Sequence, residues 1–152
     1  MNARRLLSHA RNPKRRLTPG DLLPTFKAGW REIGGVRKYY RSRWEANYAR
    51  YLNWLVVKKQ HFTRWSHEPR TFWFPEIKRG VRSYLPDFEV ERLDGTIEYH
   101  EVKGYLDPKS ITKLRRMAKY YPEIKLVLIN RVNYMAIAKM ACRLVQGWEA
   151  DS

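Results

Sequence analysis

The sequence predicts an α/β fold in which a mixed central β-sheet is flanked by helices, and three patterns carry this prediction. From residue 42 to about residue 59, large apolar side chains recur at steps of three and four, as on one face of a helix. Two alternating segments, 84–92 and 96–103, are joined by a short loop around Gly95, which is typical of a β-hairpin. Residues 124–130 (IKLVLIN) form a nearly continuous apolar run, typical of a strand covered on both faces.

The other segments complete the order α, β, β, β, α, β, α. Residues 64–74 alternate and are rich in aromatic side chains, so we expect a strand there, with Pro69 at an edge or a bulge. The turn-rich segment 29–35 is interpreted as a linker. Asp107 followed by Pro108 indicates the first turn of a helix that reaches about residue 121.

The last strand, 124–130, is expected to pair in parallel with 96–103. Asn133 is predicted to cap a last helix, whose apolar positions approximate one stripe: Met135, Ala138, Cys142 and Val145. We therefore expect one domain, residues 21–152, after a basic N-terminal arm of residues 1–20.

The composition indicates a polyanionic partner. Of 152 residues, 31 are Lys or Arg and 15 are Asp or Glu, which gives a formal net charge of +16. With 6 Trp and 10 Tyr, the chain combines cationic and flat side chains, which suit phosphates and exposed bases better than a lipid surface. The single cysteine, Cys142, excludes an intrachain disulfide and a thiolate zinc site, and no apolar run reaches the ~18 residues of a membrane span. We expect a soluble, cytoplasmic protein with no membrane partner.

Residues 1–20 contain six cationic side chains and no acidic one. A basic arm of this kind can follow a nucleic-acid backbone, but it can also be an inert solvated tail or an Arg-rich transit peptide. The first alternative assigns DNA contacts to the arginines of the arm: Arg4, Arg5, Arg15 and Arg16.

The predicted hairpin carries an acid on one strand and an acid-x-lysine on the other. A three-residue loop, 93–95, pairs Asp87 with Glu101. Because successive side chains of a strand alternate, Lys103 then shares the face of Glu101. A two-residue turn would put Asp87 opposite Val102, on the wrong face, since a one-residue slip inverts every side chain.

Two carboxylates this close repel each other unless a cation lies between them. Asp87 and Glu101 therefore suit a hard divalent ion such as Mg²⁺ or Mn²⁺, beside which Lys103 could orient a water or offset developing phosphate charge. The alternative is a solvated hairpin face with a cross-strand ion pair, because this spacing alone is common in charged proteins.

Glu45 is a second source of a carboxylate. Ser42 and Glu45 match the S-x-x-E pattern of a capping box, in which Glu45 satisfies only backbone donors. The alternative is that Glu45 points toward the metal as a ligand or base. His100 is expected to turn away from the carboxylates and pack, while His61 and His67 have no partner at metal-ligand spacing. No G-x-x-x-x-G-K-[ST] motif occurs, so no nucleotide cofactor is expected.

Three motifs in order resemble the PD-(D/E)xK nuclease superfamily: 41–45 (RSRWE), 84–88 (YLPDF) and 101–104 (EVKG). Within it they are most similar to the phage endonuclease I family of Holliday junction resolvases, from which the chain departs in its longer hairpin, its Trp-rich first helix and strand and its basic arm. The resemblance covers roughly residues 40–130 and implies a restriction-endonuclease-like αβββαβ core. It also implies metal ligands and a water-positioning lysine: Asp87, Glu101, the Val102 carbonyl and Glu45 as ligands, and Lys103 for the water.

The function implied is a Mg²⁺-dependent endonuclease, with Mn²⁺ as a substitute, that resolves four-way DNA junctions by paired cuts as a homodimer. The alternatives are a sequence-specific endonuclease of the same superfamily, of transposon-end, homing or restriction type, and a non-catalytic basic DNA-binding protein. Besides the arm, the expected phosphate contacts come from Arg41, Arg43, Lys109, Lys113, Arg115 and Arg116.

Overall fold

The computed structural model describes residues 27–150. Two strands come first, β1 (Gly29–Ile33) and β2 (Val36–Tyr40), followed by α3 (Arg43–Val57) and β3 (Phe62–His67). The remaining elements are β4 (Phe72–Trp73), β5 (Ser83–Tyr84), β6 (Phe88–Arg92), β7 (Ile97–Val102), α4 (Pro108–Tyr120), β8 (Lys125–Ile129) and α5 (Arg131–Leu144).

The central sheet has four strands in the order β3-β6-β7-β8. Strand β6 pairs antiparallel with β3 and with β7, whereas β7 and β8 are parallel. The parallel pair is connected through α4, which supplies the long crossover that two parallel strands require. The sheet is therefore mixed, and the predicted parallel pairing of the last strand is confirmed.

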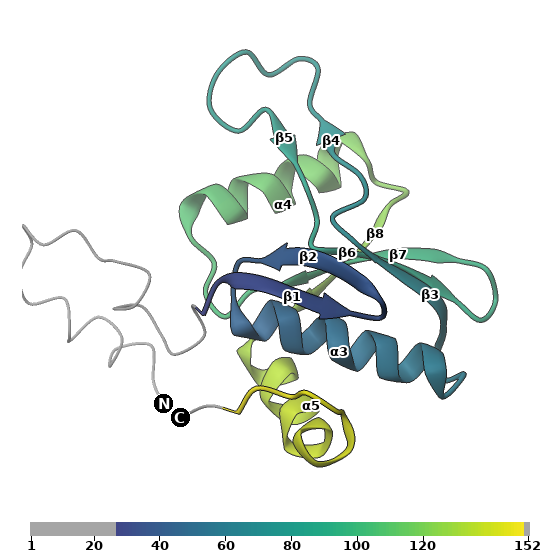
Figure 1. Cartoon of the computed structure of the whole chain (residues 1–152). Helices are drawn as coiled ribbons and strands as arrows, with labels where there is room; N and C mark the ends of the chain where they lie inside the picture. The colour runs from purple at the N-terminus through teal and green to yellow at the C-terminus, as the bar shows by residue number, and fades with distance from the viewer. Residues whose placement is uncertain (1–26, 151–152) are drawn as a thin grey trace, which may run out of the picture.

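Helices cover both faces of this sheet (Figure 1). On one face, α3, α5 and the β1–β2 hairpin enclose a core that includes Phe88. On the other, α4 and the β4–β5 pair enclose a smaller core that includes Tyr99 and Met117. Because side chains alternate along β7, His100 and Glu101 point to opposite faces of the sheet.

The segment 29–35 is not a linker, as the sequence suggested, but the first strand and turn of a hairpin. Gly34 and Gly35 form the turn with φ values of 61° and 78°, a left-handed conformation that glycine adopts readily and that suits a two-residue hairpin turn. Gly34 also lies against α3, since a Cβ built on it would come within 2.7 Å of Asn53 Oδ1. The glycines therefore mark a tight turn between two short strands.

The predicted strand 64–74 is in fact two strands. Strand β3 ends at His67, and Glu68 adopts a φ of 48° just before Pro69, which has no N–H for a sheet hydrogen bond. Strand β4 pairs instead with β5 in a separate two-stranded sheet. This pair and its connecting loop project from the rest of the fold (Figure 1).

Helix α5 begins earlier than the sequence suggested. Its N-cap is Asn130 rather than Asn133, and the Asn130 side chain accepts a hydrogen bond from the Asn133 N–H at 2.9 Å. Tyr134 packs into the core, which turns Met135 and Cys142 outward. The predicted apolar stripe is therefore wrong at Met135 and Cys142.

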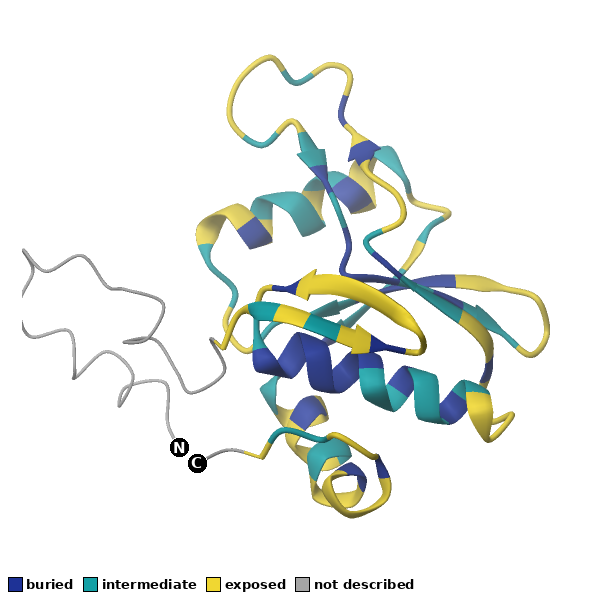
Figure 2. Ribbon diagram, viewed as in Figure 1, coloured by how far each residue is buried: buried dark blue, intermediate teal, exposed yellow. Residues whose placement is uncertain are grey.

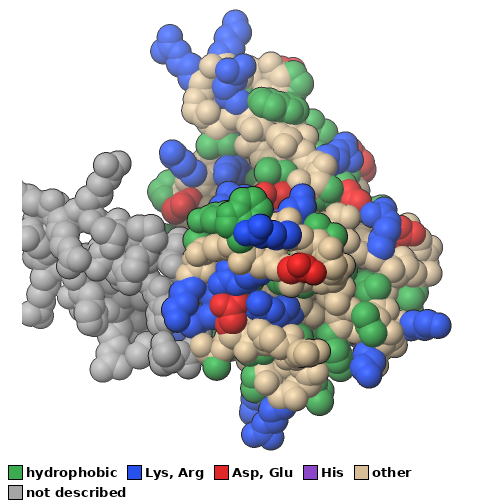
Figure 3. Space-filling model, viewed as in Figure 1, with side chains coloured by type: hydrophobic (Ala, Val, Ile, Leu, Met, Phe, Trp, Pro, Cys, Tyr) green, Lys and Arg blue, Asp and Glu red, His purple; other side chains and the backbone are tan. Residues whose placement is uncertain are grey.

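Burial and charge follow these layers. Much of α3 is buried, whereas the loop between β4 and β5 and much of the β1–β2 hairpin are exposed (Figure 2). Lys and Arg side chains spread over the face drawn in Figure 3 and project from the β4–β5 loop. Within residues 27–150, no helix has the length and apolar character needed to cross a membrane.

Candidate active site

The β6–β7 hairpin has the register that the three-residue loop predicted. Gly95 closes the loop at a φ of 86°, and Phe88 lies opposite His100. The next residues outward along the two strands are Asp87 and Glu101. The predicted pairing of these two acids is therefore confirmed.

Main-chain N–H groups hold both carboxylates. Asp87 Oδ2 accepts a hydrogen bond from the Val102 N–H at 2.8 Å, and the Asp87 N–H donates to Glu101 Oε2 at 3.3 Å. Glu101 Oε2 also accepts a hydrogen bond from the Tyr84 hydroxyl at 2.8 Å. Each acid is thus fixed by the backbone of the neighbouring strand, and Val102 adjoins the site through its N–H.

The electrostatics of this pair favour a bound cation. Burial raises the pKa of Asp87 well above its usual range, and the charges of Glu101 and Glu45 raise it further. Burial also raises the pKa of Glu101, although the Tyr84 hydrogen bond and the Lys103 charge act in the opposite direction. A divalent cation here would relieve the repulsion among the carboxylates.

Lys103 directly follows β7. Its N–H donates to the Ile129 carbonyl at 3.0 Å, which continues the parallel pairing of β7 with β8 beyond the strand end. Its charge acts on Glu101, two residues earlier on the same face of the strand. Lys103 therefore lies where it could contact a group bound at the two acids.

Glu45 takes part in the cap of α3, and its side chain also contacts a residue on another element. The Ser42 hydroxyl accepts a hydrogen bond from the Glu45 N–H at 3.0 Å, as a capping residue does. Glu45 Oε2 accepts from the Arg41 N–H at 2.8 Å, while Oε1 lies 2.6 Å from His67 Nε2. One carboxylate thus satisfies a backbone donor at the start of α3 and reaches the end of β3.

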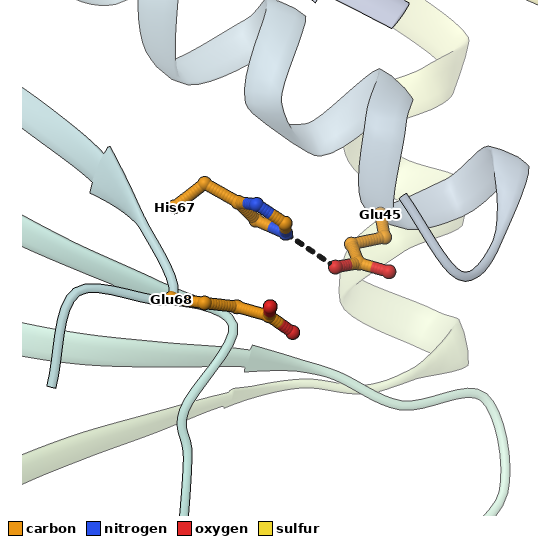
Figure 4. Close-up of side chains that lie close together, drawn as sticks. All are labelled: Glu45, His67 and Glu68. Atoms are coloured by element: carbon orange, nitrogen blue, oxygen red, sulfur yellow. Dashed lines mark hydrogen bonds and ion pairs between the residues drawn. The ribbon is translucent and has the colours of Figure 1, made fainter. Parts of the chain in front are cut away.

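The side chains of Glu45, His67 and Glu68 form a cluster whose ligand atoms all lie within 4.8 Å of one another (Figure 4). The Arg41 guanidinium donates to the Glu68 carboxylate. The Glu68 N–H donates to the Asp87 carbonyl at 2.8 Å, so this cluster and the β6–β7 acids adjoin. An imidazole with carboxylates suits Mn²⁺ or Zn²⁺, whereas oxygen ligands alone suit Mg²⁺.

Sequence reasoning missed His67 and Glu68 as members of the site. His67 was expected to have no partner at metal-ligand spacing, but its partner Glu45 lies 22 residues earlier, on a different element. The Tyr40 ring also packs on His67, at 4.4 Å between ring centroids. The one signal in the sequence was the position of both residues just before Pro69, where a strand has to end.

His100 is packed, as alternation predicted. It is buried on the face opposite the acids, with Nδ1 2.6 Å from the Tyr48 hydroxyl and Nε2 3.0 Å from Glu98 Oε2. Two polar neighbours thus occupy both ring nitrogens. His100 is therefore no candidate ligand.

The predicted phosphate-contacting residues differ in how far they are exposed to solvent. Lys109, Arg115 and Arg41 are exposed. Arg43 is only 1% exposed and donates to the Ala150 carbonyl at 3.1 Å, so its prediction as a DNA contact is wrong: the first turn of α3 directs it into the protein.

Two further basic residues of α4 are partly covered. The Lys113 ammonium lies 6.0 Å from the Tyr84 ring centroid, and the Arg116 guanidinium donates to the Val81 carbonyl. Both therefore also have local packing roles. The arm arginines Arg4, Arg5, Arg15 and Arg16 lie outside the residues that the structure describes.

Comparison with known proteins names no relative. Protein-family models, curated protein sequences and solved structures were each searched, and none matches this chain.

Proposed function

We propose that this chain is a metal-dependent DNA endonuclease of the PD-(D/E)xK type, which hydrolyses phosphodiester bonds of the DNA backbone. The observation that carries this proposal is the pair Asp87 and Glu101, two carboxylates held by main-chain N–H groups, with the charge of Lys103 acting on Glu101. The element order α3-β3-β6-β7-α4-β8 supports it, because it is the αβββαβ order of a restriction-endonuclease-like core once the short β4–β5 pair is set aside.

The donor set fits Mg²⁺, with Mn²⁺ as a substitute. Asp87, Glu101, Glu45 and the Val102 carbonyl would hold the ion, since hard cations prefer oxygen ligands. The pKa of Asp87 is raised by burial and then by the charges of Glu101 and Glu45, and a bound cation would offset these negative charges. When bound, the ion would polarise a water and stabilise charge on the phosphate oxygens.

Lys103 supplies the remaining chemistry. Its ammonium is a compact charge on the face of Glu101, where it would orient the attacking water or offset the negative charge that develops on the phosphate. Tyr84 would act indirectly, because its hydroxyl fixes the Glu101 carboxylate. In this scheme Lys103 contacts the reacting groups and Tyr84 is a positioning residue.

The proposed substrate is branched DNA, with a four-way junction first. Exposed cations at Arg41, Lys109 and Arg115 would contact phosphates, and such contacts position a duplex without reading its sequence. DNA shape would then select the substrate. Paired cuts across a junction require two active sites, which a two-fold homodimer would provide.

The test compares matched four-way-junction, fork and linear DNA in Mg²⁺ and in EDTA. The wild-type protein should introduce symmetric nicks in the junction in Mg²⁺ and none in EDTA. Asp87→Asn should still bind the junction but should not cut it. Glu91→Gln is the matched control, because Glu91 lies on β6, the strand that directly follows Asp87, and pairs with Arg64 at 2.5 Å, away from the acids.

Each outcome of this assay is informative. Cleavage of unbranched duplex at a fixed sequence would indicate a restriction, homing or transposon-end endonuclease instead. Cleavage by Asp87→Asn at the wild-type rate would rule out the proposed site. Junction binding without cleavage in Mg²⁺ would leave a non-catalytic DNA-binding protein.

A further inference from the structure

The outer face of the β1–β2 hairpin carries an exposed aromatic pair. Trp30 and Tyr39 lie opposite each other in the hairpin register, with 61% and 47% of their surfaces exposed. Their ring centroids are 5.7 Å apart at an interplanar angle of 77°, an edge-to-face arrangement. Arg37 places its guanidinium 5.2 Å from the Trp30 ring centroid. In Figure 3, a hydrophobic patch bordered by Lys and Arg side chains lies over this hairpin.

The hairpin does not need this pair for its attachment to the fold. Ile33 and Tyr40, on its other face, are buried in the core with α3 and hold the hairpin down. A cross-strand aromatic pair adds only modest stability to a hairpin. An apolar surface left in water beside cations is instead typical of a binding site.

The aromatic pair lies close to the candidate active site. Tyr40, the residue after Tyr39, packs on His67 with 4.4 Å between ring centroids. Arg41, the next residue, donates to Glu68. At about 3.3 Å per extended residue, Tyr39 is about 7 Å along the strand from Arg41. A nucleotide that contacts the pair would therefore lie near Arg41, whose charge acts on Asp87.

We propose that Trp30 and Tyr39 form a stacking platform for an unpaired base of the DNA substrate; this inference rests on the proposed function, in which DNA is the substrate. Aromatic rings stack with any base, but a fully stacked duplex offers no free base face. Exposed Arg37, on the same face as the pair, supplies positive charge for a flanking phosphate, and its cross-strand partner Glu32 is the one acid in residues 29–40. The platform would thus recognise a branch point by its unstacked base.

The test measures binding in EDTA, where the DNA stays intact. Fluorescence anisotropy compares a fully paired four-way junction with one that carries an unpaired nucleotide gap at the crossover. The wild-type protein should prefer the gapped junction. Trp30→Ala/Tyr39→Ala should lose about 5- to 150-fold in affinity for it, the range that one stacked base contributes. Its affinity for the paired junction should change much less.

Two control variants separate stacking from folding. Trp30→Phe/Tyr39→Phe keeps both rings and should retain most of the preference for the gapped junction. Trp73→Ala removes another exposed tryptophan, 59% exposed on β4, and should bind like the wild type. Circular dichroism checks that each variant is folded. As a second readout, oligo-dT should quench tryptophan fluorescence less in Trp30→Phe than in the wild type.

Three results would overturn the platform. The first is that Trp30→Ala/Tyr39→Ala and the wild type have equal affinity for the gapped junction, and the second is that Trp73→Ala loses as much affinity as that double variant. The third is binding to phosphatidylcholine–phosphatidylserine vesicles that depends on Trp30, while DNA affinity does not. Cleavage in Mg²⁺ tests the proposed function separately. If the protein cuts junctions but its binding does not depend on Trp30, only the platform proposal is wrong. If its binding depends on Trp30 but it does not cut, only the nuclease proposal is wrong.

Discussion

Glu45 lies where the start of α3 meets the end of β3, and its two carboxylate oxygens have different partners. One accepts from the Arg41 N–H at 2.8 Å, and the other lies 2.6 Å from His67 Nε2. Its charge also raises the pKa of Asp87, although burial and the charge of Glu101 contribute more to that rise. A local capping motif therefore delivers a carboxylate to the candidate active site.

The capping and catalytic roles can be separated by two substitutions in the same turn. Glu45→Gln keeps an acceptor for the Arg41 N–H but removes the charge, so junction cleavage should fall by about 10²- to 10⁴-fold, as for loss of an acid or base group. Ser42→Ala removes the cap and should cost about 1 kcal/mol of unfolding free energy while leaving cleavage intact. Cleavage rates and urea unfolding curves measure the two effects. The opposite pattern, inactive Ser42→Ala and active Glu45→Gln, would show that Glu45 serves only the helix.

At the scale of elements, two short hairpins modify the predicted order. The β1–β2 hairpin covers α3 and carries the aromatic platform, and the β4–β5 pair covers α4. The sequence predicted neither, because the glycines of segment 29–35 suggested a linker, and alternation across residues 64–74 does not show where one strand ends and the next begins. The β6–β7 hairpin was predictable because one glycine-containing loop sets its register.

The two turn glycines of β1–β2 should differ in their tolerance of a side chain. Gly35→Ala meets no atom within 4 Å and should cost about 1 kcal/mol, the strain of a left-handed alanine. Gly34→Ala has the same strain and also a Cβ 2.7 Å from Asn53 Oδ1, so its cost should be larger, about 2–3 kcal/mol. Chemical denaturation measures both. Equal losses would show that Asn53 moves away freely.

Strand β7 contains a buried acid that makes folding sensitive to acid. Burial acts to raise the pKa of Glu98, but hydrogen bonds from His100 and from Lys125, at 3.0 and 2.7 Å, outweigh it and lower the pKa to about 2. Arg92 Nη1, at 3.1 Å, is a second cationic neighbour besides Lys125. Because the pKa is lower in the folded state, the stabilisation is present above the unfolded pKa near 4.3 and is lost as the pH falls toward 2.

Glu98→Gln should therefore remove a pH-dependent contribution to the free energy of unfolding. The wild type should be the more stable protein at pH 6, by up to about 3 kcal/mol. This advantage should shrink between pH 5 and pH 2. Urea denaturation across this range measures the difference. A gap between wild type and variant that stays constant down to pH 2 would contradict the assignment.

For the whole molecule, the dominant property is a net charge of +16. Some of the Lys and Arg side chains that contribute to it are buried or form ion pairs within the fold. Arg43 is buried, and Arg64 pairs with Glu89 and Glu91 at 3.1 and 2.5 Å. Others, such as Lys109 and Arg115 on α4, are exposed. The DNA-binding surface is therefore a subset of the cations that the sequence counts.

Salt dependence should distinguish these two groups of cations. Lys109→Gln/Arg115→Gln should reduce the slope of log K against log salt for junction binding by about 2, because two phosphates would no longer be neutralised by the protein. Arg64→Gln should leave the slope nearly unchanged, because its charge is already paired. Anisotropy titrations over a range of salt concentrations provide the slopes. A larger change for Arg64→Gln would place the DNA on the β3 edge instead.

The sequence by itself determined the parts of this protein that depend on neighbours along the chain. The loop at Gly95 was enough to pair Asp87 with Glu101. Strand alternation then predicted that Lys103 shares the face of Glu101. Only the tertiary structure decided which distant residues join them. His67 meets Glu45 because β3 ends beside the first turn of α3. Such contacts depend on how elements pack, which local periodicity does not encode.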